Sequence, residues 1–236
     1  MGTLESAKKT AAYKAVDEYL KDGCVVGIGN GATVAYAVKR LAERVRDENL
    51  SLVCIPASYT ARELIFVNDL VLGELETSPI IDFTIDGADE VDENLNVING
   101  GGGYFTQGKI LASCSNDLII VSDYTKSVKK FGGPYKKAIA IEVIPFASVP
   151  IIEKIQSKFG GSVKLRIAPK IGPVVTDNGN FILDWDFPND INDWEKTSTL
   201  ISLIPGVIET GIFIKLATRA YFGLEDGSVR EQLIKN

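Results

Sequence analysis

Two kinds of hydrophobic pattern alternate along the first half of the chain. In one, apolar residues recur every three or four positions, which predicts a helix with a single buried stripe. This spacing covers residues 4–20, 33–46, 58–67 and 104–114. In the other, a short and almost wholly apolar run predicts a strand buried on both faces. These runs cover residues 24–28, 52–55, 80–85 and 118–121. Strands that alternate with helices predict a parallel sheet covered on both faces.

The pattern changes near residue 130, where shorter elements follow in mixed order. The pattern predicts strands at 139–144, 163–167 and 207–214, and helices at 149–159 and 191–203. Asp177-Asn178-Gly179-Asn180 separates the apolar runs 173–176 and 181–184, which predicts a β-hairpin. We therefore predict an α/β protein whose parallel-sheet domain comprises residues 1–130 plus 205–236. A smaller α+β domain comprises residues 131–204, and the strand at 207–214 should return to the main sheet.

Composition narrows the class of protein. Hydrophobic residues make up 45% of the chain, enough for a substantial core. The net charge of −6 and the lack of a basic tract argue against nucleic acid as a partner. No apolar run is long enough for a membrane span, and the N-terminus lacks the pattern of a signal peptide. Cys24, Cys54 and Cys114 have neither zinc-site nor disulfide spacing, so we expect core thiols in a cytoplasmic protein.

The chain contains no histidine. This absence excludes Ser-His-Asp and Cys-His nucleophilic machinery and makes a transition-metal site improbable. Acid–base chemistry must therefore use carboxylates, lysine or tyrosine. We expect neither a metal nor a cofactor.

A glycine-rich loop follows the first predicted strand and opens the next helix. It reads Gly27-Ile28-Gly29-Asn30-Gly31-Ala32-Thr33. Three interpretations are open: a dinucleotide site, an anion site on the helix N-terminus, or a tight turn needed only for packing. The acidic residue that a dinucleotide site requires is missing after the next strand, so we favour a phosphate or similar anion. Thr33, with Lys8 or Lys9, would supply hydroxyl and charge.

Two further strings follow the third predicted strand. Asp86-Gly87-Ala88-Asp89-Glu90 lies at the edge of the sheet where α/β ligand crevices form. Its acids repel one another, which tends to raise a pKa; the alternative is a solvated loop or helix cap. The second string, Asn99-Gly100-Gly101-Gly102-Gly103, suits a backbone that lies close to a ligand, because no Cβ intervenes.

With these strings the chain resembles the type A ribose-5-phosphate isomerases, particularly the eukaryotic ones. The resemblance spans nearly the whole chain, through GIGNGAT, LVCIPAS, DGADEVDENLN, NGGGG, IEVIPFASVP, PVVTDNGNFILDW and IPGVIETGIF. It implies a Rossmann-like α/β parallel-sheet domain with a second, smaller α+β domain, assembled as a homodimer or homotetramer. It also implies the interconversion of ribose 5-phosphate and ribulose 5-phosphate through an enediol, without a metal.

The resemblance assigns roles to individual positions. Asp86 and Asp89 would act in ring opening and hold sugar hydroxyls. The predicted sugar-phosphate contacts are Lys8, Gly29, Asn30, Gly31, Ala32, Thr33, Gly100, Gly101, Gly102 and Lys126. Two catalytic positions depart from the family pattern, since Asn99 stands where the family has lysine and Gly108 where it has glutamate.

These two departures bear on activity. The family lysine stabilises the enediolate, and the family glutamate moves the proton between carbons 1 and 2. Without them we expect impaired or lost catalysis. Because one cation and one anion are removed together, no buried charge is orphaned. Three interpretations stay open. The first is a slow isomerase, and the second is a non-catalytic paralogue that binds a sugar phosphate or another small anion or serves an assembly role. The third is an altered chemistry in the space that Gly108 leaves where the family has a glutamate side chain, with Tyr104 lining that space.

Overall fold

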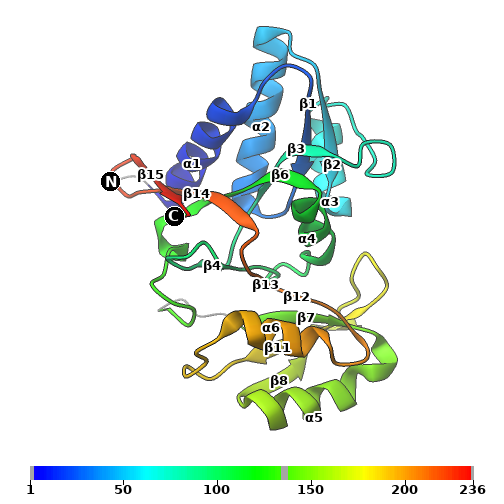
Figure 1. The fold of residues 1–236 in the computed structure, drawn as a ribbon. Coiled ribbons are helices and arrows are strands. Elements are labelled where there is room, and N and C mark those ends of the chain that lie inside the picture. Colours follow the sequence, from blue (N-terminus) through cyan, green and yellow to red (C-terminus); the bar gives the residue numbers. More distant parts are fainter. Residues whose placement is uncertain (1–2, 134–137, 235–236) are drawn as a thin grey trace.

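The computed structural model describes residues 3–133 and 138–234. Its largest feature is a six-stranded sheet of order β15-β14-β6-β3-β1-β2 (Figure 1). Its strands are β1 (Cys24–Ile28), β2 (Leu52–Pro56), β3 (Ile81–Asp86), β6 (Ser115–Asp123), β14 (Ala217–Gly223) and β15 (Val229–Leu233). All neighbouring strands are parallel except β14 and β15. The predicted α/β fold with a largely parallel sheet is confirmed.

Helices cover both faces of this sheet, as the alternating pattern predicts. One face packs against α1 (Leu4–Tyr19), α2 (Ala32–Glu48) and α3 (Tyr59–Val67), which share one apolar core with the strands. The other face packs against α4 (Thr106–Ser113), which follows the four-glycine turn. No helix in the described part of the chain is long and apolar enough to cross a membrane.

A second, antiparallel sheet has the order β12-β7-β11-β8. Its strands are β7 (Ile139–Val143), β8 (Ser162–Leu165), β11 (Phe181–Asp186) and β12 (Val207–Thr210). Its core includes side chains of α5 (Ser148–Phe159) and α6 (Trp194–Ser202) around the fully buried Trp185. A three-stranded sheet of β4 (Glu90–Val91), β5 (Val97–Ile98) and β13 (Ile212–Phe213) completes the connection between the two parts (Figure 1).

The prediction of one strand at 207–214 that returns to the main sheet is wrong. The segment is divided at Gly211, whose N–H donates to the carbonyl of Ala140 at 2.7 Å. The residues before it pair with β7, and those after it pair with β5. A Cβ at position 211 would lie 2.1 Å from the carbonyl oxygen of Asn99, so this crossing requires glycine. The strand that returns to the main sheet is β14.

The predicted hairpin around residues 177–180 is present as a turn, in which the N–H of Thr176 donates to the carbonyl of Asn180 at 2.9 Å, but its pairing is limited to one bridge, between Val175 and Phe181. Both edges of β11 are already occupied, by β7 and β8. The division into residues 1–130 plus 205–236 and 131–204 stays a prediction. Because β12 pairs with β7 of the smaller sheet, the chain returns to the larger domain near residue 211 rather than at residue 205. Residues 1–2, 134–137 and 235–236 of these units lie outside the described part.

A buried carboxylate ties the small sheet to the loops beside the main sheet. Glu142 on β7 is 1% exposed, and its oxygens accept hydrogen bonds from four side chains. The donors are Thr106 Oγ1 at 2.5 Å, Thr176 Oγ1 at 2.8 Å, Asn178 Nδ2 at 3.0 Å and Asn180 Nδ2 at 2.8 Å. Glu142 thereby fixes the loop 176–180 against the start of α4.

Replacing this carboxylate tests its role. We expect Glu142→Ala to lower the free energy of unfolding by about 3 kcal/mol, because buried hydroxyl donors lose their acceptor. Glu142→Gln keeps one acceptor oxygen and should cost about 1 kcal/mol. Urea unfolding of both variants measures the difference, and equal stability of wild type and Glu142→Ala would contradict the assigned role.

Candidate active site

The candidate site lies at the carboxyl ends of β1 and β3. The loop Gly29–Gly31 follows β1 and leads into α2, while Asp86 is the last residue of β3. These strands are adjacent and parallel, so the residues that follow them meet at one edge of the sheet. The predicted placement of both loops at one edge of the sheet therefore agrees with the geometry.

Asp86 is the centre of this edge. Its side chain is buried, and Oδ1 accepts from the backbone N–H groups of Asn30 at 2.9 Å and Gly87 at 2.8 Å. Its Oδ2 accepts from Nδ2 of Asn99 at 3.0 Å. A Cβ at position 29 would lie 2.1 Å from Oδ1, so only glycine permits this approach. The carboxylate thus joins the loop after β1 to the turn that begins at Asn99.

Burial raises the pKa of Asp86 to about 7, although its hydrogen bonds act in the opposite direction. The charge of Asp89 adds a smaller upward contribution. The sequence predicts a raised pKa from repulsion within the acidic string. The predicted upward shift of the pKa agrees with the structure, but its main cause is the removal of Asp86 from water rather than repulsion by Asp89.

The four-glycine turn binds Asp89, the second aspartate of the acidic string, through a backbone hydrogen bond. The N–H of Gly101 donates to Oδ2 of Asp89 at 2.7 Å, and the N–H of Gly100 donates to Oδ1 of Asn99 at 2.7 Å. Gly100 has φ 108°, a region that favours glycine. Arg166, which sequence reasoning missed, donates Nη1 to the carbonyls of Gly100 at 3.0 Å and Gly101 at 3.2 Å. This arginine anchors the turn from the small sheet.

Position 108 faces the same carboxylate. Gly108 is buried on α4, and a Cβ built there would lie 3.0 Å from Oδ2 of Asp86. The next atom, Cβ of Ala57, would be 4.0 Å away. Positions 86, 99 and 108 therefore converge on one oxygen atom, with no charged partner for it from Asn99 or Gly108.

A cavity of about 610 Å³ opens in front of this cluster. Of the predicted site residues, it is lined by Lys8, Asn30, Gly31, Ala32, Thr33, Asp89, Asn99, Gly102 and Lys126. The other predicted residues do not line it: Gly29, Asp86, Gly100, Gly101 and Gly108. Lys8 forms an ion pair with Glu5 at 2.6 Å. The geometry brings the predicted residues into one cluster.

The cavity wall contains residues that the sequence analysis did not name as contacts. They are Ala35, Thr60, Leu64, Gly87, Ala88, Ser122 and Asp123. Tyr104, which the sequence analysis named only for an altered chemistry, lines the cavity as well. Ser122 and Asp123 end β6, and the rule for carboxyl ends of parallel strands could have found them. Thr60 and Leu64 are one helical turn apart on α3, where nothing in the pattern indicates a ligand-facing side.

Asn30 lines this cavity, but both polar atoms of its side-chain amide are turned into the protein. Its Oδ1 accepts from Ser58 Oγ at 2.5 Å. Its Nδ2 is buried and has no hydrogen-bond partner among the described residues. A buried amide donor without a partner carries a desolvation cost, which the protein bears at this edge of the sheet.

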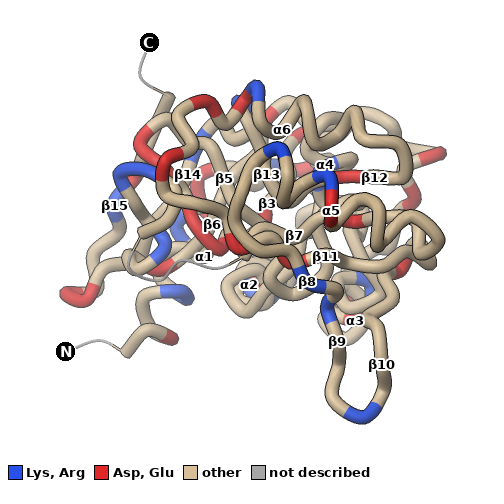
Figure 2. Tube along the Cα trace, turned by 90° about the horizontal axis from the view of Figure 1, so that it is seen from below, with Lys and Arg blue, Asp and Glu red and all other residues tan. Residues whose placement is uncertain are grey.

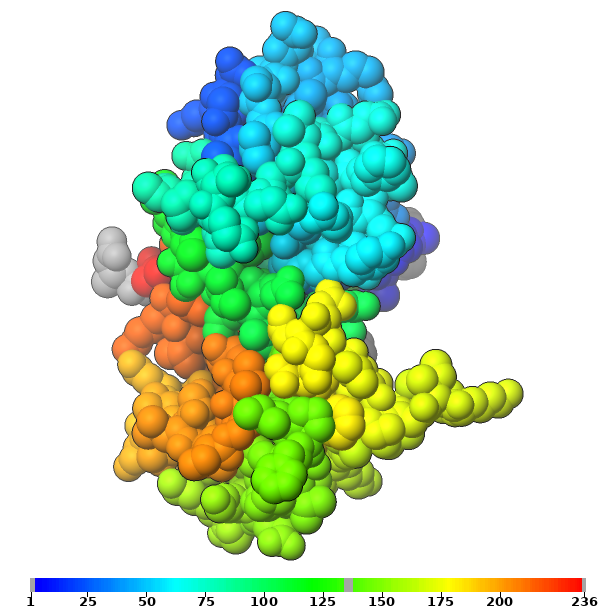
Figure 3. Space-filling model, turned by 90° about the vertical axis from the view of Figure 1, so that its right-hand side faces the viewer, coloured from blue at the N-terminus to red at the C-terminus, as the bar shows by residue number. Residues whose placement is uncertain are grey.

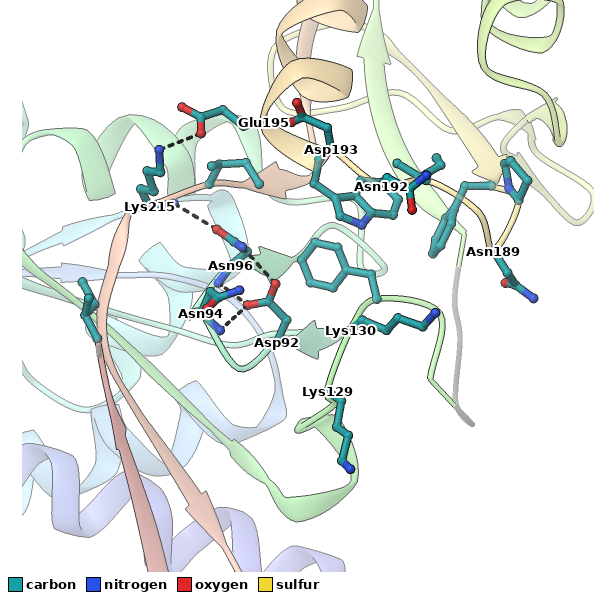
Figure 4. A pocket seen from close by; sticks show the side chains of 17 residues that line it. Asp92, Asn94, Asn96, Lys129, Lys130, Asn189, Asn192, Asp193, Glu195 and Lys215 are labelled. Atoms are coloured by element: carbon teal, nitrogen blue, oxygen red, sulfur yellow. Dashed lines mark hydrogen bonds and ion pairs between the residues drawn. The ribbon is translucent and has the colours of Figure 1, made fainter. Parts of the chain in front are cut away.

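A second cavity, of about 620 Å³, lies between the turn after β4 and the start of α6 (Figure 4). Some of its polar groups already bind one another. Asp92 accepts from the N–H groups of Asn94 and Asn96 at 2.8 Å each, and Lys215 pairs with Glu195 at 2.6 Å. None of the predicted site residues lines it. Within residues 3–133 and 138–234, no cluster of histidine, cysteine, aspartate and glutamate has the arrangement of a metal site.

The approach of Gly29 to Asp86 can be tested by adding one methyl group. Gly29→Ala would place Cβ 2.1 Å from Oδ1, so Asp86 must move and lose the N–H of Asn30. We expect a loss of about 2–4 kcal/mol in unfolding free energy. Gly102→Ala is the matched control, because its Cβ meets only Cδ2 of Tyr104 at 3.7 Å. Similar thermal stability of the two variants would refute this role of Gly29.

The raised pKa of Asp86 predicts a pH dependence of stability. A carboxyl whose pKa rises from 3.8 to about 7 binds its proton more tightly when folded. Its contribution to unfolding free energy therefore falls as pH rises from about 4 to 7, by at most about 1.4 kcal/mol per unit. We expect the difference in unfolding free energy between wild type and Asp86→Asn to fall over this pH range, and urea unfolding measures it. A difference that is constant over this range would contradict the raised pKa.

Comparisons with known proteins agree with this geometry. The family model described as ribose 5-phosphate isomerase A (phosphoriboisomerase A) matches residues 53–227. The chain is 52% identical over 230 residues to ribose-5-phosphate isomerase of Homo sapiens, covering 97% of this chain and 74% of that protein. It is 46% identical over 234 residues to that of Dictyostelium discoideum, covering 98% and 100%.

Solved structures give the same answer. A D-ribose-5-phosphate isomerase in complex with phospho-erythronic acid superposes with a TM-score of 0.93 at 38% identity, covering 98% of this chain and 100% of that one. The enzyme of Plasmodium falciparum has a TM-score of 0.92 at 36% identity, with the same coverage. Agreement in family model, sequence and structure leads to one conclusion: this chain belongs to the ribose 5-phosphate isomerase A family.

Proposed function

We propose that this chain has a ribose-5-phosphate isomerase scaffold that binds a sugar phosphate, with its own isomerase catalysis impaired or lost. Family membership supports the substrate class, since the relatives are named for ribose 5-phosphate. One solved relative holds phospho-erythronic acid, a phosphorylated sugar acid. The convergence of positions 86, 99 and 108 on one carboxylate oxygen carries the proposal about catalysis.

The phosphate-binding side of the cavity retains what an anion requires. Gly31 caps α2 without a side-chain hydrogen bond, so the first N–H groups of a 17-residue helix stay available. Thr33 adds a hydroxyl, while Lys8 and Lys126 add positive charge from α1 and from the short 3₁₀ helix Tyr124–Lys126 that follows β6. These groups support binding of a phosphate ester.

The reacting side lacks what enediol chemistry requires. Isomerisation needs a base that moves a proton between two carbons and a positive group near the developing oxyanion. Gly108 has no side chain, and Asn99 is neutral and already donates to Asp86. Loss of a base costs about 10²–10⁴ in rate and loss of an oxyanion partner about 10²–10³, and the two effects need not add.

One observation favours a binding role over a slow enzyme. Burial raises the pKa of Asp86 to about 7, and Asn99 satisfies Oδ2 without bringing a charge. The polar groups at positions 86 and 99 therefore satisfy each other by hydrogen bonding. Loss of the family lysine alone would have left the carboxylates at positions 86 and 108 without a cation. We propose a non-catalytic paralogue that binds a sugar phosphate as the second candidate. Tyr104 lines the cavity, but its position alone does not favour an altered chemistry.

We further propose that the protein works in the cytoplasm as a homodimer or homotetramer, with neither nucleic acid nor membrane as a partner. The family resemblance supports assembly. So do large apolar side chains that are exposed on the single chain, such as Phe66 and Phe146. Most soluble homo-oligomers are closed and symmetric, with twofold dimers commonest.

The proposal predicts the behaviour of restored side chains. We expect the present chain to bind ribose 5-phosphate in calorimetry but to show little isomerisation in a direct assay. Asn99→Lys combined with Gly108→Glu should raise the rate at least about 10²-fold, the lower bound for a restored base. Each single variant should gain less, because a lone buried charge lacks its partner.

The controls separate binding from chemistry. Circular dichroism and calorimetry establish that each variant is folded and binds the ligand. If the unchanged chain isomerises ribose 5-phosphate at a rate typical of metabolic enzymes, the proposal that its catalysis is impaired or lost is overturned. A folded, ligand-bound double variant that stays inactive would place the defect beyond these two side chains.

A further inference from the structure

The guanidinium of Arg166 joins the small sheet to the four-glycine turn. This arginine lies between β8 and β9 (Ile167–Ala168), at the base of the hairpin of β9 and β10 (Gly172–Pro173) that projects from the molecule (Figures 2 and 3). Its Nε donates to Oδ2 of Asp184 at 2.9 Å, and its Nη2 donates to Oδ1 at 2.5 Å. The side chain of Arg166 is 16% exposed, so this bidentate pair holds the guanidinium plane in one orientation.

The backbone of Arg166 is fixed as well. Its N–H donates to the carbonyl of Ile182 at 2.8 Å, and its carbonyl accepts from the N–H of Val174 at 2.9 Å. Backbone and side chain together therefore form a rigid support on this side of the turn. From this support, the remaining nitrogen Nη1 donates to the carbonyls of Gly100 at 3.0 Å and Gly101 at 3.2 Å.

One peptide unit of the turn is held from both sides. The carbonyl of Gly100 accepts from Arg166. The N–H of Gly101 belongs to the same peptide unit and donates to Oδ2 of Asp89 at 2.7 Å. In a planar trans peptide these two groups point in opposite directions, so rotation of the unit would break both contacts at once. Such rotation is easy between two glycines, because neither carries a Cβ.

Asp89 is the cavity residue that this peptide unit holds. Its backbone N–H donates to the carbonyl of Ile98 at 2.8 Å, and its side chain lines the cavity of about 610 Å³. A guanidinium on the carbonyl strengthens the N–H of the same peptide as a donor, because linked hydrogen bonds polarise one another. Arg166 does not itself line the cavity. It therefore reaches the cavity through one peptide unit and the carboxylate of Asp89.

We propose that Arg166 is a positioning residue for sugar recognition, which directs the carboxylate of Asp89 toward the sugar part of the ligand through the peptide unit 100–101. The phosphate-side groups lie on other elements, with Thr33 on α2 and Lys126 after β6. Loss of Arg166 should therefore weaken recognition of the sugar and leave recognition of the phosphate. The inference rests on the proposed function, binding of a sugar phosphate, and assigns to that binding a residue outside the cavity.

Calorimetry with ribose 5-phosphate and with inorganic phosphate tests this division. Arg166→Met keeps most of the length of the side chain without its charge or its donors. We expect it to weaken ribose 5-phosphate at least about tenfold, the equivalent of one lost hydrogen bond. The affinity for inorganic phosphate should change by less than about twofold, as for independent sites. Arg166→Lys restores a charge but not the planar fork, so its loss should be intermediate.

The matched control is another arginine that pairs with a carboxylate. Arg219 on β14 pairs with Glu231 on β15 at 2.6 Å, and neither residue lines the cavity. Arg219→Met should therefore leave both affinities unchanged. Circular dichroism establishes that each variant is folded, and Arg166→Lys carries the same comparisons if Arg166→Met does not fold.

A double-mutant cycle tests whether Arg166 acts through Asp89. In the background of Asp89→Ala, the peptide unit no longer has a carboxylate to position. Arg166→Met should then weaken ribose 5-phosphate by less than about twofold further, because the two residues act as one unit. Losses that simply add would show that Arg166 acts by another route and would contradict the proposal.

Hydrogen exchange of the Gly101 N–H, followed by NMR, examines the peptide unit without a ligand. Gly101 is exposed, so the hydrogen bond to Asp89 is what protects this N–H. We expect exchange to be at least about tenfold faster in Arg166→Met and in Asp89→Ala, the equivalent of one lost hydrogen bond. Exchange in Arg219→Met should equal that of the wild type.

The outcomes separate this role of Arg166 from the proposed function. A wild type that does not bind ribose 5-phosphate overturns the proposed function and, with it, the part of Arg166 in sugar recognition. If the wild type binds ribose 5-phosphate, equal losses for both ligands in Arg166→Met overturn the role of Arg166 alone. Unchanged exchange of the Gly101 N–H in Arg166→Met does the same.

Discussion

The buried carboxylate of Asp86 is the contact on which the candidate site depends. It fixes the backbone of the loop after β1 through the N–H of Asn30, and it fixes the turn after β5 through the side chain of Asn99. Gly29 is required because any side chain there would overlap this carboxylate. The floor of the cavity is therefore one cooperative unit, and small substitutions in it have consequences across the site.

This dependence explains how the scaffold accommodates Asn99 and Gly108. An asparagine at position 99 satisfies Asp86 with one hydrogen bond and accepts the N–H of Gly100 with its other end. A glycine at position 108 leaves Oδ2 without a charged neighbour from α4. Neither the fold nor the glycine turn needs a charge at position 99 or 108. The proposed function follows from this, since binding and chemistry can then be lost separately.

Much of this arrangement could be predicted from the sequence, because it follows from local periodicity and from family motifs. The strands β1, β2 and β3 and the helices between them are each marked by one hydrophobic period. Long-range pairing is not encoded locally, so the break at Gly211 and the partner of β12 were missed. Arg166 was also missed, since its carbonyl acceptors lie some 65 residues away in sequence. Burial of Asp86, rather than repulsion between neighbours, became clear only in three dimensions.

Proton abstraction at carbon 2 of ribose 5-phosphate is the step on which the account depends. It can be measured directly by proton NMR in deuterium oxide, with the protein at a concentration that saturates the sugar phosphate. The account predicts that the ligand binds, as seen by line broadening, while the signal of the proton on carbon 2 persists. Loss of that signal at about one event per second or faster, a rate ordinary for enzymes, would show that a base is present. That result would contradict the claim that this site retains its ligand without its chemistry.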